Sequence, residues 1–301
     1  MKETVLLTGA TGFLGSHLLE ALVVNGYDVV ILKRSFSDTW RINHLLERIK
    51  FYDIDKVPLE KPFEDNKIDT VIHTAINYGR KGEKTTEIIE TNLMLPMRLL
   101  EISTFFNTDT FFNTDTLLYK YLNTYTLSKK QFVEWLKVFS ESSKIQGINL
   151  KIEHMYGPKD DKTKFVTWLI SELLDNKDEI SFTKGEQKRD FIYIDDIVSA
   201  YISVLKKRKE LNKFAEFDVG TGEQITIKDF VTKTKEIVAS LSGKEIMTKL
   251  NFGAIPYREG ELMEIKEDIS PLLSLGWTPK TTLDEGLEKT VKYMVKEVWN
   301  I

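Results

Sequence analysis

The N-terminal segment constrains the fold more than any other part of the chain. An apolar run, Thr4–Leu7, leads directly into GATGFLG, and apolar residues with helical spacing begin at Phe13. In such a strand–turn–helix, one glycine turns the chain, one lets the backbone approach a pyrophosphate, and one lets the helix pack against the strand. The helix N-terminus adds its positive dipole end. We therefore predict that Gly9, Gly12 and Gly15 form a dinucleotide-binding turn; a plain tight turn is the alternative.

Short β-rich runs and amphipathic helical patterns alternate through the first half of the chain. The predicted strands after the first are Asp28–Leu32, Lys50–Tyr52, Thr70–His73 and Asn149–Glu153. The predicted helices are Phe13–Val24, Tyr125–Phe139 and Glu87–Ser103, the last with Pro96 at a kink or in a first turn. Alternation of this kind builds right-handed βαβ units. The sequence therefore predicts an α/β fold, a Rossmann-like doubly wound parallel sheet with helices on both faces.

The pattern changes after Gly157, where turn-rich segments become longer. Further helices are predicted at Lys164–Leu174, Lys228–Leu241 and Asp195–Lys206, the last capped by Asp195 or Asp196. We predict that residues 1–157, joined by 189–221, form the Rossmann-like domain. Residues 158–188 and 222–301 then form a smaller C-terminal lobe, and the cleft between two lobes is the usual place for a ligand.

Composition and charge exclude several classes of function. The 301 residues carry a formal net charge of −4, with 42% hydrophobic and 29% charged residues, which is ordinary for a globular protein. There is no basic stripe, so no nucleic-acid partner is predicted. Cysteine is absent, and His17 and His44 lack metal-ligand spacing, so disulfides, thiolate catalysis and a metal site are not expected. Without a signal-peptide layout or an apolar run of ~20 residues, we expect a cytoplasmic protein with no membrane partner.

The end of the second strand, DVVILKRS, discriminates between cofactors. An NAD site places a carboxylate there to hold the ribose 2′-hydroxyl. This strand instead ends in Lys33, Arg34 and Ser35, two cations and a hydroxyl that suit a 2′-phosphate. We therefore predict NADP(H), with Asp53 and Ile54 bordering the adenine. A solvated basic loop is the alternative.

Tyr125 and Lys129 in YTLSK are four residues apart, which places both on one face of a helix. A nearby ammonium lowers the pKa of a phenol. Such a tyrosine can exchange a proton with a carbonyl or hydroxyl oxygen while hydride moves to or from a nicotinamide. The spacing alone is common and usually structural, but after a glycine turn it indicates catalysis.

Together these features resemble the extended short-chain dehydrogenase/reductases that act on nucleotide sugars. The likeness covers nearly the whole chain and is carried by GATGFLG, VIHTA, the helix around Asn92, YTLSK, HMYGP, RDFIYIDDI, YREGE and LGWTP. The resemblance implies a third catalytic group, a Ser or Thr at the end of the fifth strand. It also implies cofactor contacts from Thr11, Phe13, Leu14, Thr74, Ala75, Asn92, Thr114, Tyr125 and Lys129.

The hexapeptide FFNTDT occurs twice in succession, at residues 105–110 and 111–116, just ahead of YTLSK. The spacing to the preceding helix matches the family's helix–turn–strand length without an insertion. The resemblance therefore implies that the first copy ends the helix. Phe105 and Phe106 are expected to pack on its last turn, with Asn107 as a left-handed cap.

The second copy is then the fifth strand, in which Phe111 and Phe112 enter the sheet. Thr116 takes the catalytic position at the carboxyl edge, where ligands bind, and Thr114 is a secondary candidate. The threonines of the first copy are expected to take no part. The alternative is one long loop containing both copies. The interval from Thr116 to Tyr125 is shorter than is usual in the family, and the missing loop normally lines the mouth of the active site.

The strand end lacks the acid pair of the family's dehydratases, which carry Thr-Asp-Glu there. Leu117 and Leu118 follow Thr116, and if Thr114 is used instead, Thr116 replaces the Glu. We expect Asp115 to be a buried, hydrogen-bonded strand-end residue. What remains supports hydride transfer with one proton, either reduction of a C4 ketone or 4-epimerisation through a transient ketone. A preference for NADP favours net reduction.

Within the family, VIHTAINYGR, FFNTDT followed closely by LSKKQFVEWL, and EHMYGP resemble the CDP-abequose and CDP-paratose synthase group. That group reduces the 4-keto group of a CDP-3,6-dideoxy sugar with NADPH. The resemblance implies an NADP-dependent oxidoreductase of deoxysugar biosynthesis for surface polysaccharide such as lipopolysaccharide O-antigen. A nucleotide-sugar 4-epimerase is the alternative. A non-catalytic NADP-sensing protein is the second, against which the presence of Thr116, Tyr125 and Lys129 weighs.

The resemblance also implies substrate contacts in the smaller lobe. Arg258 in YREGE is expected to bind the nucleotide diphosphate, assisted by Lys164. His154 lies where many relatives carry an Asn beside the substrate, and a packed side chain is the equal alternative. Arg189 either contacts substrate or, as we favour, holds Asp195.

A homodimer is the predicted assembly. The helices Glu87–Ser103 and Tyr125–Phe139 carry more apolar surface than one sheet face needs. In the family such helices pair across a two-fold axis as a four-helix bundle. A monomer in which the smaller lobe covers them is the alternative.

Overall fold

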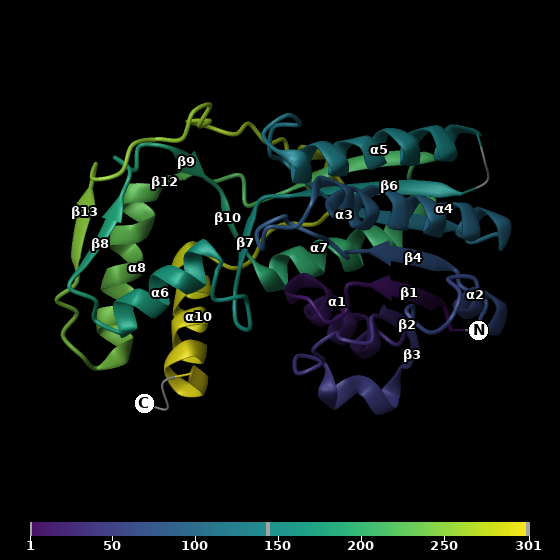
Figure 1. Ribbon diagram of the computed structural model, residues 1–301, viewed down its shortest axis with the longest axis horizontal. Coiled ribbons are helices and arrows are strands. Elements are labelled where there is room, and N and C mark those ends of the chain that lie inside the picture. Colours follow the sequence, from purple (N-terminus) through teal and green to yellow (C-terminus); the bar gives the residue numbers. More distant parts are fainter. Residues whose placement is uncertain (1, 143–144, 299–301) are drawn as a thin grey trace. The chain divides into compact units, whose positions relative to one another are not determined.

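The computed structural model describes residues 2–142 and 145–298 (Figure 1). These residues form two compact units. The first comprises residues 1–152, 198–219 and 274–277, and the second comprises residues 153–197, 220–273 and 278–301. The boundaries therefore differ from those predicted above: 153–157, 189–197 and 220–221 belong to the second unit, and 274–277 to the first.

The first unit is built on a seven-stranded sheet in the order β11-β6-β5-β4-β1-β2-β3, with every neighbouring pair parallel. Its strands are β1 (Thr4–Thr8), β2 (Asp28–Lys33), β3 (Lys50–Asp53), β4 (Thr70–His73), β5 (Thr110–Thr116), β6 (Gln146–Ile152) and β11 (Phe214–Val219). The order runs outward in both directions from β1 and β4, which defines a topological switch point. This confirms the predicted doubly wound α/β fold.

Helices cover both faces of this sheet. They are α1 (Phe13–Val24), η1 (Asn43–Arg48), α2 (Lys61–Asp65), α3 (Thr85–Ile89), η2 (Glu90–Met94), α4 (Leu95–Phe105), α5 (Thr124–Ser142), α7 (Ile194–Lys207), shared by the two units, and η3 (Arg208–Glu210). Phe111 of β5 packs against Phe132 of α5, with ring centroids 5.8 Å apart, and Phe112 packs against Tyr201 of α7 at 6.5 Å. Figure 1 shows α5 and α7 on opposite sides of the sheet. Burying each phenylalanine contributes about 2 kcal/mol.

The predicted helix Glu87–Ser103 is a continuous helical segment, α3–η2–α4, that begins earlier, at Thr85. Its middle, η2, is a π-helical stretch, and Pro96 lies in the first turn of α4. Of the two roles expected for this proline, the structure shows the first-turn position. There the missing N–H is accommodated by the wider turn that precedes it.

The two copies of FFNTDT adopt different structures, as predicted. The first copy ends α4, and Asn107 turns the chain in the left-handed region with φ of 55°. The second copy is the greater part of β5, so the alternative of one long loop is wrong. Phe106 packs against Phe63 at 5.8 Å, but Phe105 is 79% exposed, so only one of the two packs as expected. The helix ends before its last turn can bury both rings.

The second unit contains three small two-stranded sheets and several helices. The strand pairs are β7 (His154–Tyr156) with β10 (Phe191–Tyr193), β9 (Lys188–Arg189) with β12 (Ile225–Thr226), and β8 (Glu179–Phe182) with β13 (Lys249–Phe252). The helices are α6 (Phe165–Leu174), α8 (Ile227–Ser242), α9 (Ser270–Ser274) and α10 (Leu283–Val298). Phe191 and Phe230 stack at 3.8 Å, and Phe165 lies 6.0 Å from Phe230. This aromatic cluster joins α6 and α8 to β10.

One predicted helix cap is wrong. The helix α7 begins at Ile194, so Asp195 and Asp196 lie inside its first turn. The Asp196 carboxylate instead accepts hydrogen bonds from the backbone nitrogens of Lys280 (3.0 Å) and Thr281 (2.9 Å), which lead into α10.

Among the described helices, none combines the length and apolar character needed to cross a membrane.

Candidate active site

The glycine turn between β1 and α1 forms a cradle that is open on one side. Gly9 has φ of +70°, and a Cβ there would lie 2.7 Å from both the Ala75 nitrogen and Thr74 Oγ1. A Cβ on Gly15 would overlap the Gly9 carbonyl oxygen, so α1 packs on the turn only without a side chain. At Gly12 a Cβ would meet that carbonyl oxygen alone, at 3.2 Å, and no side chain caps α1. The first amides of α1 therefore fit a pyrophosphate.

Two predicted cofactor residues, Thr74 and Ala75, are held beside this turn by Thr8. Thr74 Oγ1 donates to the Thr8 carbonyl oxygen at 2.8 Å, and the backbone nitrogens of both residues donate to Thr8 Oγ1 at 3.2 and 3.3 Å. His73 Nδ1 lies 2.8 Å from the same hydroxyl, and burial lowers the pKa of His73 to about 3. The imidazole is therefore neutral. These contacts join the carboxyl ends of β1 and β4.

Other predicted cofactor residues pack or support a loop. Leu14 is buried in the first turn of α1, and Phe13 packs edge-on against His17 at 5.3 Å. Asn92 is buried in η2, where its Oδ1 accepts from the Asn77 nitrogen (2.8 Å) and its Nδ2 donates to the Asn77 carbonyl (2.9 Å). Asn92 thereby holds the segment that follows β4.

The three predicted catalytic residues come together where β5 ends and α5 begins. Tyr125 lies in the first turn of α5, and its phenol is hydrogen-bonded to the side chain of Thr116. Lys129, one turn later and 4% exposed, donates from Nζ to the Thr114 carbonyl oxygen. The Thr114 hydroxyl lies 2.7 Å from that of Tyr201. Of the two strand-end hydroxyls, Thr116 is thus the one that reaches Tyr125.

The electrostatics of Tyr125 differ from the sequence-based expectation. Burial raises the pKa of Tyr125 above its ordinary value, and Tyr78 adds to the effect, whereas Arg80 and the bond from Thr116 oppose it. The Lys129 ammonium, which was expected to lower this pKa, is directed to a backbone carbonyl. Tyr125 is therefore a phenol at neutral pH and a potential proton donor.

Two lysines and one carboxylate surround the strand end. Burial is the main cause that lowers the pKa of Lys129 to about 8; Asp115 opposes the shift and Lys130 adds to it. Asp115 Oδ2 accepts from Lys130 Nζ at 2.7 Å and from Asn149 Nδ2 at 3.3 Å. Asp115 is therefore buried and hydrogen-bonded, as predicted. It is engaged with a cation and not placed as a free acid.

Two of the three residues predicted to bind the 2′-phosphate, Arg34 and Ser35, are bound to carboxylates. Arg34 Nε donates to Asp55 Oδ1 at 3.1 Å, and Ser35 Oγ donates to Asp53 Oδ2 at 2.6 Å. Lys33 Nζ lies 5.5 Å from the ring of a phenylalanine in β3. Ile54 follows β3, and its nitrogen donates to the Lys33 carbonyl oxygen at 3.0 Å. Asp55 was not among the residues predicted at this site.

Three further residues were not predicted: two lie beside Tyr125 and one lies at the glycine turn. The ring of Tyr78 lies 5.1 Å from that of Tyr125, and the Arg80 guanidinium lies 5.1 Å from the Tyr78 ring. Arg41 Nη1 donates to the Thr11 carbonyl oxygen of the glycine turn at 3.3 Å. The motif VIHTAINYGR contains Tyr78 and Arg80 and was the available signal for them. Arg41 gave no such signal, because only folding brings it to the turn.

In the second unit, two predicted substrate residues have acidic partners. His154 Nδ1 lies 2.9 Å from Glu153 Oε2, and burial and Arg189 lower the pKa of His154, so its ring is neutral at pH 7. Arg189 is 8% exposed and forms an ion pair with Glu261 at 2.5 Å. The structural role favoured for Arg189 thus involves Glu261, and the expected partner Asp195 is wrong.

The two predicted phosphate contacts lie on loops of the second unit. Arg258 is exposed, and its carbonyl oxygen accepts from the Glu261 nitrogen at 3.1 Å. Lys164 is half-buried at the N-cap position of α6, and its nitrogen donates to the Asp161 carbonyl oxygen at 2.9 Å. Both are positioned by turns and not by regular secondary structure.

A cluster of three carboxyl groups in the second unit was not foreseen. Glu267 is hydrogen-bonded to Glu153 and Asp190, and burial raises the pKa of Glu153 to about 7 and that of Glu267 to about 9. Asp190 accepts from Thr221 Oγ1 at 2.7 Å and from the Gly222 nitrogen at 2.8 Å. Glu267 is therefore protonated at neutral pH. Across residues 2–142 and 145–298, no set of three or more ligating side chains is placed to hold a metal ion.

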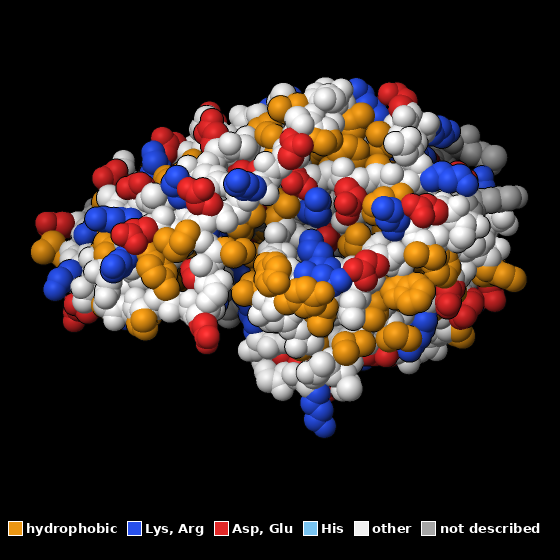
Figure 2. All heavy atoms as spheres, turned by 90° about the horizontal axis from the view of Figure 1, so that it is seen from above, with side chains coloured by type: hydrophobic (Ala, Val, Ile, Leu, Met, Phe, Trp, Pro, Cys, Tyr) orange, Lys and Arg blue, Asp and Glu red, His pale blue; other side chains and the backbone are white. Residues whose placement is uncertain are grey.

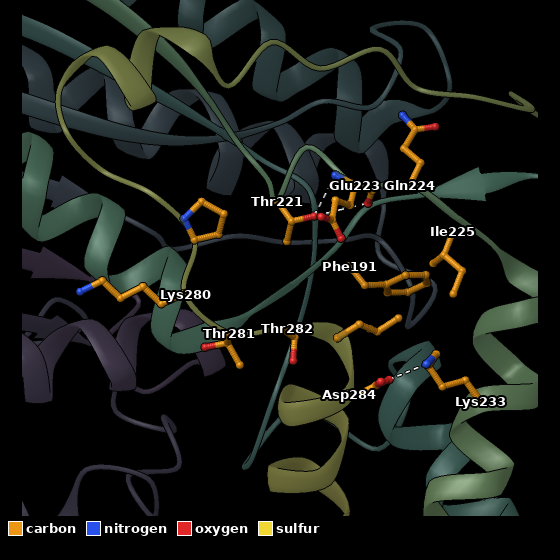
Figure 3. A pocket seen from close by; sticks show the side chains of 12 residues that line it. Phe191, Thr221, Glu223, Gln224, Ile225, Lys233, Lys280, Thr281, Thr282 and Asp284 are labelled. Atoms are coloured by element: carbon orange, nitrogen blue, oxygen red, sulfur yellow. Dashed lines mark hydrogen bonds and ion pairs between the residues drawn. The ribbon is translucent and has the colours of Figure 1, made fainter.

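A separate cavity of about 490 Å³ lies in the second unit (Figure 3). Its lining residues are Phe191, Thr221, Glu223, Gln224, Ile225, Lys233 and Pro279 to Asp284. Lys233 and Asp284 form an ion pair at 2.6 Å across one end of it. None of the residues predicted to bind substrate lines this cavity.

Comparison with known proteins gives consistent matches. The model of the NAD dependent epimerase/dehydratase family matches residues 5–220. A CDP-abequose synthase of Salmonella muenchen is 36% identical over 296 residues, which cover 96% of this chain and 97% of that protein.

Two solved structures match the fold. The UDP-glucose 4-epimerase of Thermotoga maritima, solved with UDP-glucose, has a TM-score of 0.82 and 25% identity, covering 97% of this chain and 99% of its own. The UDP-glucuronic acid 4-epimerase of Bacillus cereus, solved with UDP-glucuronic acid and NAD, has a TM-score of 0.80 and 26% identity, covering 98% and 99%.

Proposed function

Because the chain belongs to the NAD dependent epimerase/dehydratase family, we propose that it reduces the C4 ketone of a nucleotide-linked deoxysugar with NADPH. It is a nucleotide-sugar-modifying enzyme of the oxidoreductase and epimerase type. The proposed substrate is a CDP-4-keto-3,6-dideoxyhexose, destined for surface polysaccharide. Identity of 36% to a CDP-abequose synthase over nearly the full length of both chains supports this choice.

The catalytic set at the end of β5 is the observation that carries the proposal. Thr116, Tyr125 and Lys129 are assembled, while the neighbouring carboxylate, Asp115, is bound to Lys130. A dehydratase needs a second acid–base pair for the sugar carbons, and Leu117 follows Thr116 where that pair would begin. The set therefore suits a reaction that moves one hydride and one proton.

The protonation state of Tyr125 suits ketone reduction. A bound reduced nicotinamide would supply the hydride. Tyr125, kept as a phenol by burial, donates its proton to the ketone oxygen, and the Thr116 hydroxyl orients that oxygen. Lys129 is fixed on the Thr114 carbonyl one turn after Tyr125, and Arg80 and the hydrogen bond from Thr116 favour the phenolate that proton donation leaves behind.

The glycine turn supports a dinucleotide, and the end of β2 supports NADP(H) over NAD(H). The amides of α1 are open to a pyrophosphate. The end of β2 itself carries Lys33, Arg34 and Ser35 in place of the carboxylate of an NAD site, although Asp55 and Asp53, which come from the end of β3, are bonded to Arg34 and Ser35. The similar B. cereus epimerase was solved with NAD, so this preference separates the chain from that relative.

In the second unit, we assign the substrate diphosphate to Arg258, assisted by Lys164, because a guanidinium pairs with phosphate oxygens in a bidentate manner. His154, neutral at pH 7, can donate or accept a hydrogen bond to the sugar. Arg189 positions the Glu261 segment through their ion pair. The expected cytoplasmic location stays a prediction.

A homodimer remains our proposed assembly. Met94 of η2 and Trp135 and Val138 of α5 are 39%, 49% and 52% exposed. Figure 2, which looks onto the side of the first unit that carries α5, shows hydrophobic side chains between charged ones. A second copy would remove these side chains from water. Light scattering of the wild-type protein and of Trp135→Glu tests this, with a monomeric wild type contradicting it.

Nucleotide-sugar 4-epimerisation is the second candidate. The similarity to two UDP-sugar 4-epimerases at TM-scores of 0.82 and 0.80 favours it. The same three catalytic residues would serve, because an epimerase also moves one hydride and one proton but returns both.

The deciding experiment mixes the protein with NADPH or NADH and with CDP-, dTDP- and GDP-linked 4-keto-deoxy sugars, and follows absorbance of the reduced nicotinamide. Stoichiometric oxidation of NADPH with one CDP sugar is expected. No net oxidation, together with an isomer of unchanged mass from a reduced nucleotide sugar, would instead identify an epimerase. Tyr125→Phe should abolish turnover and retain NADPH binding; a wild type that binds NADPH and turns over no sugar would indicate a sensor.

A further inference from the structure

The end of β2 presents carboxylates as well as cations to any group bound there. Arg34 is engaged with Asp55, and Ser35 donates from its nitrogen to Asp55 (2.9 Å) and from its hydroxyl to Asp53 (2.6 Å). A 2′-phosphate at this edge meets two negative charges, and like charges in close proximity cost binding free energy. Arg34 and Ser35 therefore do not account by themselves for a preference for the phosphate.

Arg41 supplies a further cation, held against the glycine turn. Its Nη1 donates to the Thr11 carbonyl oxygen at 3.3 Å, and its guanidinium lies 4.5 Å from the Trp40 ring centroid. The next residue, Ile42, is fully buried and donates its nitrogen to the Thr39 carbonyl at 2.8 Å. The buried anchor, the stacking and the hydrogen bond together hold the guanidinium at the turn.

The turn and the end of β2 adjoin in the sheet. Thr8, the last residue of β1, is in register with Leu32 of β2, so Thr11 and Arg34 follow neighbouring strand ends. In a dinucleotide site the adenosine ribose lies at this place. A ribose bound there would have Arg41 on the side of the turn and Arg34 on the side of the strand end.

We propose that Arg41 is the residue that selects NADP(H) over NAD(H), by binding the 2′-phosphate; the inference rests on the proposed use of NADPH. A guanidinium binds phosphate oxygens through two parallel hydrogen bonds and stays charged at every working pH. Arg34, oriented by Asp55, is the second and weaker contact. Neither the glycine turn nor the end of β2 contains this residue, so sequence motifs do not reveal it.

Isothermal titration calorimetry with NADP⁺ and NAD⁺ tests the proposal on the whole protein. Arg41→Met keeps an unbranched apolar stem beside Trp40 and removes the charge. It should raise the Kd for NADP⁺ about 10- to 100-fold, the usual value of a hydrogen-bonded charge, and leave the Kd for NAD⁺ within about twofold. Arg48, exposed in η1 of the same connection, provides the matched control, and Arg48→Met should change neither Kd.

Each other result overturns the proposal in a distinct way. Equal loss of NADP⁺ and NAD⁺ affinity in Arg41→Met would assign Arg41 to holding the turn. Unchanged NADP⁺ preference in that variant would assign selection to Arg34. A wild type that binds NAD⁺ as tightly as NADP⁺ would contradict the proposed cofactor itself.

Two further measurements keep the test decisive if Arg41→Met is poorly folded. Arg41→Lys retains the charge but loses the planar guanidinium that forms two parallel hydrogen bonds. It should weaken NADP⁺ binding less than Arg41→Met and leave NAD⁺ binding unchanged. In the wild type, adenosine 2′,5′-bisphosphate should bind more tightly than 5′-AMP, and Arg41→Lys should reduce that difference. The same difference in affinity between adenosine 2′,5′-bisphosphate and 5′-AMP in the wild type and in Arg41→Lys would contradict the proposal.

Discussion

The two copies of FFNTDT have the same residues and different structures. In the first copy Phe105 is 79% exposed, and Asn107 turns the chain with φ of 55°. In the second copy Phe111 is fully buried, and Asn113 is an ordinary strand residue that donates to Asn149 Oδ1 at 2.8 Å. Because the local propensities are identical, the surroundings alone decide which copy forms the strand.

The same comparison separates the hydroxyl that we propose to be catalytic from structural ones. Thr108 donates to the Ile68 carbonyl at 3.1 Å, and Thr110 pairs in register with Thr70, so both lie at the amino end of the sheet. Thr116 lies at the carboxyl end and is bonded to Tyr125. Ligands bind at the carboxyl end of parallel strands, so a shift by one copy along the chain changes the role of a threonine.

The largest expected difference between the copies concerns their phenylalanines. Phe111→Ala should lower the free energy of unfolding by about 3–5 kcal/mol, because it leaves a cavity between β5 and α5. Phe105→Ala, the matched change in the first copy, should cost less than about 0.5 kcal/mol. Urea unfolding followed by circular dichroism measures both. Similar losses for the two variants would break the comparison.

The threonines give the next effect, in catalysis and not in stability. Thr116→Val should lower kcat for ketone reduction about 10²- to 10³-fold, since it removes a hydrogen bond to the reacting oxygen. Thr110→Val keeps the shape at the other end of the strand and should leave kcat nearly unchanged. The Kd for NADPH, measured in parallel, should be the same in both variants. Equal kcat values for both variants would remove Thr116 from the catalytic set.

The buried acids Asp115 and Glu267 should differ in how they make the stability of the protein depend on pH. Asp115 of the second copy has Lys130 as its partner. Burial raises the pKa of Glu267 from 4.5 to about 9, with Asp190 and Glu153 adding to the shift, and burial raises the pKa of Glu153 to about 7. A raised carboxyl pKa contributes stability that is complete below about pH 4.5 and is lost as pH rises through 7 to 9.

The midpoint of thermal unfolding should therefore fall between pH 6 and 9 in the wild type, and fall less in Glu267→Gln, which keeps a neutral hydrogen-bonding group. Glu264→Gln, an exposed change on the same segment, is the control and should follow the wild type. Identical pH profiles for all three proteins would show that Glu267 does not have a raised pKa in the folded protein.

The smallest expected effect tests the turn itself. Asn107→Ala should destabilise the protein by about 1 kcal/mol, because alanine lacks the asparagine's tolerance of positive φ. Asn107→Gly should be neutral or slightly stabilising. Thermal unfolding distinguishes them. A loss at Asn107→Gly as large as at Asn107→Ala would mean that the side chain, and not the backbone, matters at this position.

Much of the first unit followed from local patterns, because its signals are short in sequence. The glycine turn, the strands β1 to β4 and β6, and the Tyr125–Lys129 pair each lie within one segment, and periodicity or spacing identified them. The strand β5 was placed through the family resemblance, and β11 was not predicted. Phe105 and the cap of α7 were wrong at element ends, where a shift of one or two residues decides burial and capping. The partner of Arg189 was wrong because an ion pair between distant segments leaves no local signal.

Local sequence patterns were sufficient to place the strands β1 to β4, the helices α1 and α5, and the glycine turn between β1 and α1. Backbone periodicity and glycine spacing act over a few residues, so they survive without knowledge of the fold. The tertiary structure alone decided which FFNTDT copy is buried, which hydroxyl reaches Tyr125, and that Arg41 lies on the glycine turn beside carboxylates that bind Arg34 and Ser35. These outcomes depend on contacts between segments far apart in the chain, and only packing brings such segments together.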